Sequence, residues 1–293
     1  MRIGDSFSRK LFNLFNILFM IFLVFVTLYP MLHIAFASLS NASRLMKHQG
    51  LIFWPLQFTT AAYRLVMKNN MIGTGYQNTL FVVTAGVFIN ILLTSIGAYV
   101  LSRKNVMWSK HMMFMVVFTM FFSGGLIPTY FTVKELGLEN TLWALIIPAS
   151  INTFNLIIMR TSFMALPESL IESAKLDGAG HVGILFLIVI PLSLPVVAVI
   201  ILYYAVGHWN SWFSAMLYLK ERNLYPLQLV LREILIQNDT NIMSSSASMG
   251  DQESVSETIK YAVIMVATIP ILCIYPFLQK YFVKGVLVGA VKQ

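Results

Sequence analysis

Residues 184–206 read ILFLIVIPLSLPVVAVIILYYAV, an apolar run without a charged side chain. A helix that crosses the hydrocarbon core of a bilayer needs about 20 mainly apolar residues, so this run is long enough to be one span. Similar runs lie on both sides of it. The sequence therefore predicts an all-α integral membrane protein, a single transmembrane domain over residues 1–293, with spans at 17–38, 79–101, 112–133, 141–159, 184–206 and 259–282.

The composition excludes an ordinary soluble protein, because 58% of the residues are hydrophobic, only 11% are charged and the mean hydropathy is +0.76. A net charge of +8 could indicate a nucleic-acid partner. The basic residues, however, lie in short groups between the apolar runs, which is typical of membrane orientation signals. We therefore expect membrane lipid and no nucleic acid around this chain. Cys273 is the only cysteine and lies within an apolar run, so we expect neither a disulfide nor a metal cluster.

Short loops predict the orientation of the spans. The link at residues 102–111 carries three basic residues and no acidic one, whereas the next link carries Lys134 beside two glutamates. Cytoplasmic loops are enriched in lysine and arginine, so the first link is expected to be cytoplasmic. Six spans then place both termini in the cytoplasm. The first run is too long for a signal-peptide core and lacks a small-residue cleavage site, so we interpret it as a retained span.

The connection at residues 160–183 contains the sequence LPESLIESAKLDG. Its proline suits the start of a helix and its glycine the residue just past the end. Leu170, Ile171 and Ala174 share one face of that short helix, while two glutamates share another. Such a helix could lie on the membrane interface, but interfacial helices usually have basic polar faces. The acidic face favours the alternative, a partner protein with a groove and basic residues.

The same region resembles the EAA motif of ATP-binding-cassette (ABC) importer permeases. That motif reads EAA, then G, then I-x-LP at fixed spacing. The matching residues are Glu172, Ala174, Gly178, Ile188 and Pro191. Two positions depart from the motif, namely Ser173 and Ile190.

Further segments resemble the maltose-type carbohydrate permeases, and most of all the branch that includes the YtcP and LplC permeases. These segments are Arg160, Phe163 and Leu166-Pro167-Glu168 before the motif, Trp209-Asn210 after the fifth span, and the ending from Lys280 to Lys292. Together they extend over most of the chain. The resemblance implies the type I ABC importer permease fold of six transmembrane helices, in a multi-pass protein of the bacterial cell membrane.

The resemblance also implies a mechanism. The short helix between the fourth and fifth spans would be the coupling helix, which sits in a cleft of the ATPase subunit. The residues expected to couple are Glu172, Ser173, Ala174, Gly178, Glu168 and Asp177. The implied partners are a second homologous permease, an ABC ATPase dimer, an extracytoplasmic solute-binding protein and a carbohydrate, in particular an oligosaccharide.

The chain lacks the pattern that would let it bind nucleotide itself. No Gly-x-x-x-x-Gly-Lys-Ser/Thr sequence occurs, so the phosphates of ATP have no glycine-rich loop to cradle them. ATP and Mg are therefore expected on the partner ATPase, and this chain is expected to be no enzyme. Its five histidines are scattered and form no His-Glu-x-x-His pair, so no metal site is expected.

Candidates for the substrate path combine aromatic rings with polar groups near the membrane. They are Tyr203, Tyr204, Trp209 and Asn210 near the outer end of the fifth span, and Asn152 and Asn155 in the fourth. Tyrosine and tryptophan also form belts at membrane interfaces for physical reasons alone. Asparagines within spans either bond between helices or line a cavity, and both interpretations are open.

Other transport classes are weaker alternatives. An ion-coupled secondary transporter of a small solute usually needs ionisable residues at membrane depth, and the spans contain no Asp, Glu, Lys or Arg near their centres. A channel is disfavoured because no filter-like motif or ring-forming charge appears. An intramembrane enzyme is disfavoured because no nucleophile and base occur at a recognisable spacing.

Overall fold

The computed structural model describes residues 7–244, 258–274 and 276, and the side chains of residues 237–244 are not described. These residues form helices joined by short connections, with no β-strand in the described part of the chain. The all-α prediction is therefore confirmed. The described residues divide into two compact units, one formed by 7–69 with 233–244 and 258–269, the other by 70–232 with 270–274 and 276.

The first unit begins with helix α1, Phe7–Ser38, which runs through 32 residues with Pro30 inside it. Its apolar side chains are exposed along most of its length, as expected for a helix that faces lipid. Two short helices follow, α2 (Ala42–Lys47) and α3 (Ala61–Met67). Helix α1 is long enough and apolar enough to cross a membrane on its own, and it starts ten residues before the predicted span.

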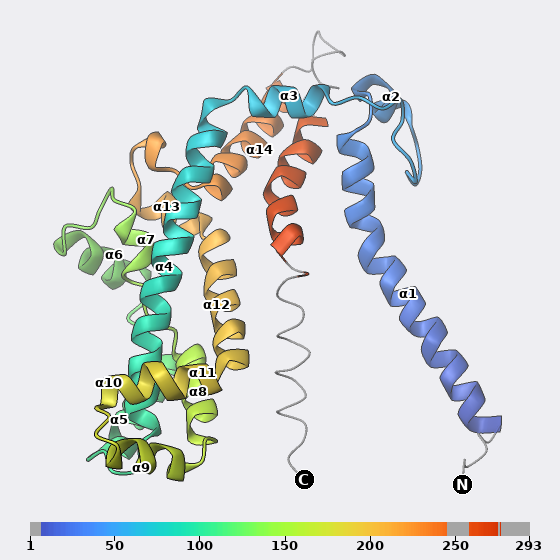
Figure 1. Cartoon of the computed structure of the whole chain (residues 1–293). Coiled ribbons are helices and arrows are strands. Elements are labelled where there is room, and N and C mark those ends of the chain that lie inside the picture. The colour runs from blue at the N-terminus through green and yellow to red at the C-terminus, as the bar shows by residue number, and fades with distance from the viewer. Residues whose placement is uncertain (1–6, 245–257, 275, 277–293) are drawn as a thin grey trace. The chain divides into compact units, whose positions relative to one another are not determined.

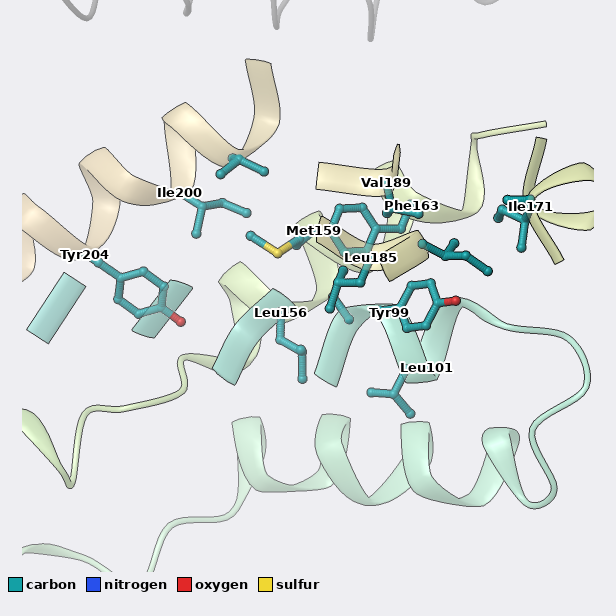
Figure 2. Close-up of a cluster of buried hydrophobic side chains, with 14 residues drawn as sticks. Tyr99, Leu101, Leu156, Met159, Phe163, Ile171, Leu185, Val189, Ile200 and Tyr204 are labelled. Atoms are coloured by element: carbon teal, nitrogen blue, oxygen red, sulfur yellow. The ribbon is translucent and has the colours of Figure 1, made fainter. Parts of the chain in front are cut away.

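The second unit is built around helix α4, Asn70–Ser102, which has 33 residues and is also long enough to cross a membrane. Helices α8 (Thr153–Met164) and α12 (Leu194–Trp209) pack along it (Figure 1). Between these three helices lies a cluster of buried side chains drawn in Figure 2. Helix α4 starts nine residues before the predicted span.

The predicted third span, 112–133, is not one continuous helix. The structure has two helices there, α5 (Ser109–Phe121) and α6 (Leu126–Glu135), bent by 113°. Gly125, just before α6, has a φ of 84°, in the left-handed region that favours glycine. The paired glycines at 124 and 125 therefore allow a turn that the apolar composition alone did not reveal.

The predicted fourth span is also interrupted. A short helix α7, Trp143–Ile146, is followed by the non-helical residues 147–152 and then by α8. Pro148 lies in the non-helical segment, where the lack of an N–H and the fixed φ of proline disfavour a helix. The loop predicted at 160–183 is shorter than expected, because α8 continues to Met164 and the next apolar segment begins at His181.

The predicted fifth span, 184–206, is bent by 89° near Ser193. Before the bend lie α10 (His181–Ile184), the π-helical turn η1 (Leu185–Val189) and α11 (Ile190–Leu192), and after it lies α12. Pro191 cannot donate a backbone hydrogen bond to the preceding turn, and a π turn is one way in which a helix adapts to such a loss. Pro195 lies in the first turn of α12, a position that tolerates proline.

The remaining elements are short or lie near the end of the described chain. They are α9 (Glu168–Leu176), α13 (Trp212–Tyr218), the 3₁₀ turn η2 (Arg222–Leu224), α14 (Leu227–Ser244) and an apolar helix at Thr258–Ile274. The end of the predicted sixth span, 277–282, and the basic C-terminal segment lie outside the described residues. In the described part, two helices qualify as spans by themselves, and up to four if each bent pair is one span.

Candidate functional site

Helix α9 ends in a tight backbone turn. Gly178, the residue after the C-cap Asp177, has a φ of 86°. Its N–H donates to the carbonyl of Lys175 at 3.0 Å, and the N–H of Ala179 donates to the carbonyl of Ala174 at 2.9 Å. These two bonds form a Schellman motif, which requires a left-handed residue at this position. The predicted role of glycine as the end of this helix is therefore confirmed.

One side of α9 is covered by the chain itself. Ile171 is 3% exposed and Ala174 is 8% exposed, and both belong to the buried cluster that includes Phe163 and Leu185. Leu170, which was predicted to share the apolar face, is 44% exposed, because its position around the helix is about 100° away from Ile171. Helix α9 therefore rests on the buried cluster of its own chain, while its other face is exposed.

The open face of α9 carries acidic and apolar groups together. Glu172 and Ser173 are exposed, as is Asp177 at the end of the helix. Leu176 is 89% exposed. With Leu170, which is 44% exposed, it leaves apolar surface uncovered beside the charged groups of this helix.

Glu168 at the start of α9 has a partner within the chain. Its Oε2 lies 2.6 Å from Nζ of Lys104, in the link between α4 and α5. The hydrogen bond from Lys104 and then its positive charge hold the pKa of the Glu168 carboxyl below its usual value, and the same contact raises the pKa of Lys104. Both side chains are largely exposed, so the contact orients the helix start more than it stabilises the fold.

Two arginines close the ends of α4 and α8. Arg160 Nε donates to the carbonyl of Leu101 at 2.8 Å, in the last turn of α4. Arg103 Nη2 donates to the carbonyl of Phe163 at 3.2 Å, in the last turn of α8, and to Ser102 Oγ at 2.9 Å. The last carbonyls of a helix have no partner inside it and carry partial negative charge, so each guanidinium satisfies the end of the other helix. We call this pair the arginine clasp.

The buried cluster extends from α9 to the break before α8. Figure 2 shows Ile171 at one end and Tyr204 at the other. The Tyr204 hydroxyl lies 2.8 Å from Thr94 Oγ1 and accepts a hydrogen bond from the backbone N–H of Asn152 at 3.0 Å. Asn152 in turn caps α8, since its Oδ1 accepts from the N–H of Asn155 at 3.1 Å. Two predicted site residues, Tyr204 and Asn152, are thus brought together.

A polar residue of α4, Asn90, also holds the non-helical segment 147–152 in place. Asn90 is fully buried, and its Nδ2 donates to the carbonyls of Ala149 at 2.7 Å and Ser150 at 2.8 Å. Its Oδ1 lies 2.7 Å from Nε2 of His208. An amide oxygen can only accept, so His208 carries its proton on Nε2. Asn90 therefore links α4 to the segment before α8 and to α12. His208 was not among the site residues predicted from the sequence.

The remaining substrate-path candidates differ in exposure. Tyr203 is 45% exposed, whereas Trp209 is 7% exposed and its Nε1 has no hydrogen-bond partner in the described part of the chain. Asn210 is exposed, and its Nδ2 donates to the carbonyl of Val206 at 3.0 Å. Asn155 is 5% exposed. Among the aromatic candidates, Tyr203 thus has the most accessible ring.

No group of three or more His, Cys, Asp or Glu side chains gathers in the described ranges in a way that could hold a metal ion. The arrangement instead offers a short helix with one face buried and one face open, joined by a packed core to hydrogen-bonded breaks in the neighbouring helices. It is suited to mechanical contact with a partner.

Comparison with known proteins decides the family. The chain is 42% identical over 288 residues to the polygalacturonan/rhamnogalacturonan transport system permease protein YtcP of Bacillus subtilis strain 168, covering 97% of this chain and 99% of the relative. The chain belongs to the permeases of carbohydrate ABC transport systems. This permease is also 42% identical over 267 residues to protein LplC of the same organism, covering 91% of this chain and 90% of the relative. No protein-family model matches it.

A solved structure supports the same conclusion. A bacterial ABC transporter involved in the import of the acidic polysaccharide alginate contains a chain that is 31% identical to this permease, with a TM-score of 0.84. The match covers 94% of this permease and 98% of that chain. The predicted resemblance to carbohydrate ABC permeases is therefore confirmed, and with it the membrane location. Relatives of this kind are transport permeases rather than enzymes.

Proposed function

We propose that this permease forms half of the translocation pathway of a bacterial importer for an oligosaccharide, beside a second homologous permease. Similarity over nearly the whole chain to a permease for polygalacturonan and rhamnogalacturonan, and to a chain of an alginate importer, supports this substrate class. The observation that carries the proposal is α9, a short helix between α8 and α10 whose inner face is packed and whose outer face is open.

The proposed topology has six spans in a single transmembrane domain over residues 1–293, with both termini in the cytoplasm. Helices α1 and α4 each supply one span, and the bent pairs α5–α6 and α10–α12 each supply another. The segment of α7 and α8 and the helix at Thr258–Ile274 supply the remaining two. The basic residues between α4 and α5 support a cytoplasmic position for that end of the unit.

In this proposal α9 is the coupling helix. Glu172 and Ser173 face the ATPase, Leu176 enters an apolar part of its cleft, and Gly178 shapes the turn that lets the helix dock closely. ATP and Mg are bound by the ATPase dimer. Closure of that dimer pushes α9, and the packed cluster from Ile171 to Tyr204 carries the displacement to α4, α8 and α12.

The substrate path lies between the two permeases, and an extracytoplasmic solute-binding protein delivers the sugar to it. Tyr203 offers an exposed ring for stacking against a sugar face, and Asn210 offers an exposed amide. Tyr204, Asn152 and Asn155 act behind that surface, where they hold the break before α8 in position.

The test combines genetics with reconstitution. Deletion of the gene should abolish uptake of at least one oligosaccharide, and the tagged permease should co-purify with a second permease and an ABC ATPase. Purified alone it should hydrolyse no ATP, and the assembled transporter should hydrolyse ATP faster with sugar-loaded binding protein. Uptake that persists without the ATPase but collapses with the ion gradient would favour the alternative, an ion-coupled secondary transporter.

A further inference from the structure

The break before α8, residues 147–152, lies near the middle of the membrane in the proposed topology. It is bonded to Asn90 of α4, a continuous helix that is long enough to cross the membrane alone. The stretch from Asn90 to Ser102, where α4 ends, rises about 18 Å along the helix axis. The basic loop after Ser102 marks the membrane edge, and the hydrocarbon core is about 30 Å thick. The non-helical backbone therefore lies at mid-depth.

Buried polar side chains hold this break from behind. Asn90 and Thr94 are fully buried, and Tyr204 is 6% exposed. The amide of Asn90 bonds to the carbonyls of residues 149 and 150. The Tyr204 hydroxyl, which lies 2.8 Å from Thr94 Oγ1, accepts from the N–H of Asn152. Burying polar groups costs free energy unless they are bonded, and all three are bonded here. The break is therefore a fixed part of the fold rather than a frayed helix end.

The opposite side of the break is open. Ile151 is 50% exposed, and Asn152 is exposed as well. In the described part of the chain the backbone N–H and C=O of Ile151 make no hydrogen bond, and neither does Nδ2 of Asn152. Hydrocarbon cannot satisfy such groups, so irregular backbone occurs at membrane depth only where protein buries it or where it lines a water-filled cavity. This side of the break therefore does not face lipid.

Neutral polar groups gather beside the break. Thr119 of α5 is exposed, and its Oγ1 lies 3.5 Å from Oγ1 of Thr153, the first residue of α8. The Thr119 hydroxyl donates to the carbonyl of Val116 at 2.7 Å, which leaves its lone pairs free to accept. Just beyond Thr119 the third span is itself interrupted, at 122–125. Donors and acceptors left free at neighbouring interruptions of two spans favour water over the apolar surface of a partner.

We propose that this break lines the water-filled path of the sugar inside the membrane. Asn152, Thr119 and Thr153 bind hydroxyl groups of the passing sugar. The Asn152 amide and the Ile151 N–H can donate, while the threonine oxygens and the Ile151 carbonyl can accept, and a sugar hydroxyl does both. Neither interrupted segment carries an ionised side chain, which suits hydroxyl groups better than an ion. The inference rests on the proposed function and adds a contact deeper in the membrane than those at the outer end of α12.

The reactivity of introduced cysteines tests whether the break meets water. The complete transporter in nanodiscs carries Cys273→Ser and either Ile151→Cys or the control Phe88→Cys. Phe88 is 70% exposed on the regular helix α4, at nearly the same depth as Asn90. A sulfonated methanethiosulfonate, which is charged and does not enter lipid, should modify Ile151→Cys about tenfold faster, because apolar surroundings raise the pKa of a thiol and reduce its reactive thiolate. Mass spectrometry of the purified chain measures both rates.

Transport by proteoliposomes tests whether the hydroxyls bind the sugar. Thr119→Val keeps the shape of the side chain and removes its hydroxyl, Thr119→Ser restores it, and Thr84→Val is the control. Thr84 is exposed on α4, and its hydroxyl bonds within its own helix, to the carbonyls of Leu80 and Phe81. The probes are maltotriose, arabinotriose and trigalacturonate, of which those that the deletion strain fails to take up are used. Thr119→Val should import about three- to tenfold less sugar per ATP hydrolysed, the effect of one hydrogen bond, whereas a purely structural loss lowers uptake and hydrolysis together.

The possible results separate this inference from the proposed function. Equal modification of Ile151→Cys and Phe88→Cys would overturn the inference, because nothing would then distinguish the break from a regular helix. An unchanged ratio of uptake to hydrolysis in Thr119→Val, or an equal loss in Thr84→Val, would overturn it as well. Each of these results leaves the proposed function standing. A deletion strain that takes up every saccharide normally would instead refute the proposed function itself.

Discussion

Replacing Gly178 by alanine alters the backbone preference at the end of α9 without creating a clash. A Cβ at this position would have no atom within 4 Å, so the added methyl group meets open space. The φ of 86° is nevertheless a left-handed conformation, which costs a residue with a side chain about 1–2 kcal/mol. The strain falls on the two hydrogen bonds that end the helix.

If α9 docks on the ATPase only in this conformation, that cost reduces the docked population roughly five- to thirtyfold. Binding-protein-stimulated ATP hydrolysis and sugar uptake by the reconstituted transporter should fall by the same order. Gly178→Asn should have a smaller effect, because asparagine tolerates the left-handed region better than alanine does. Thermal unfolding should separate loss of coupling from loss of the fold.

Gly180 offers a matched control two residues away. It also has no atom within 4 Å of a built Cβ, but its φ is −73°, which any residue can adopt. Gly180→Ala should therefore leave uptake and stimulated hydrolysis near wild-type values. If Gly178→Ala performs as well as Gly180→Ala, the end of α9 does not set the coupling geometry and the mechanism is wrong.

Other predictions concern the end of the same unit that we propose to be cytoplasmic. Arg160→Met removes the hydrogen bond to the end of α4 and should lower the free energy of unfolding by about 2 kcal/mol. Its melting temperature should be lower than that of the control Lys110→Met, which changes an exposed side chain. Equal melting temperatures would contradict the arginine clasp. The lowered pKa of Glu168 means that its contact with Lys104 contributes above the ordinary carboxyl pKa and is lost as the pH falls through the lowered value. In Lys104→Gln the pKa of Glu168 should rise toward its ordinary value, measured by carboxyl ¹³C NMR; no change would remove the proposed contact. In a cysteine-free background, a cysteine introduced at Lys175 should react only with reagents that enter the cytoplasm, and labelling from outside intact cells would reverse the topology.

Composition and motif spacing were sufficient for the helical class, the position of α9 and its glycine end. They were insufficient for the bends, because an apolar run reports how well a segment dissolves in lipid and carries little information on its direction. Gly125 and Pro195 were visible, but a glycine or proline in a transmembrane segment is compatible with a straight helix when its neighbours satisfy the backbone.

The packed, polar face of α4 could have been predicted from the sequence. Gly86, Asn90, Thr94, Ala98 and Ser102 recur every four residues, and in a membrane helix small and polar residues at this spacing indicate a packed face. The partner of Asn90 could not be inferred, because His208 is 118 residues further along the chain. Such a pairing depends on the three-dimensional packing of two spans.

The contact between His208 and α4 also restricts how this protein can change over evolutionary time. A Cβ built on Gly86 would lie 2.5 Å from Nε2 of His208, so the imidazole occupies the space that any larger residue would need. Substitution at position 86 therefore depends on position 208, because alanine at 86 requires the imidazole either to move away or to be exchanged for a smaller side chain. Since His208 also contacts the Asn90 amide, its exchange would remove that hydrogen bond. Positions 86, 90 and 208 are therefore expected to vary together among relatives.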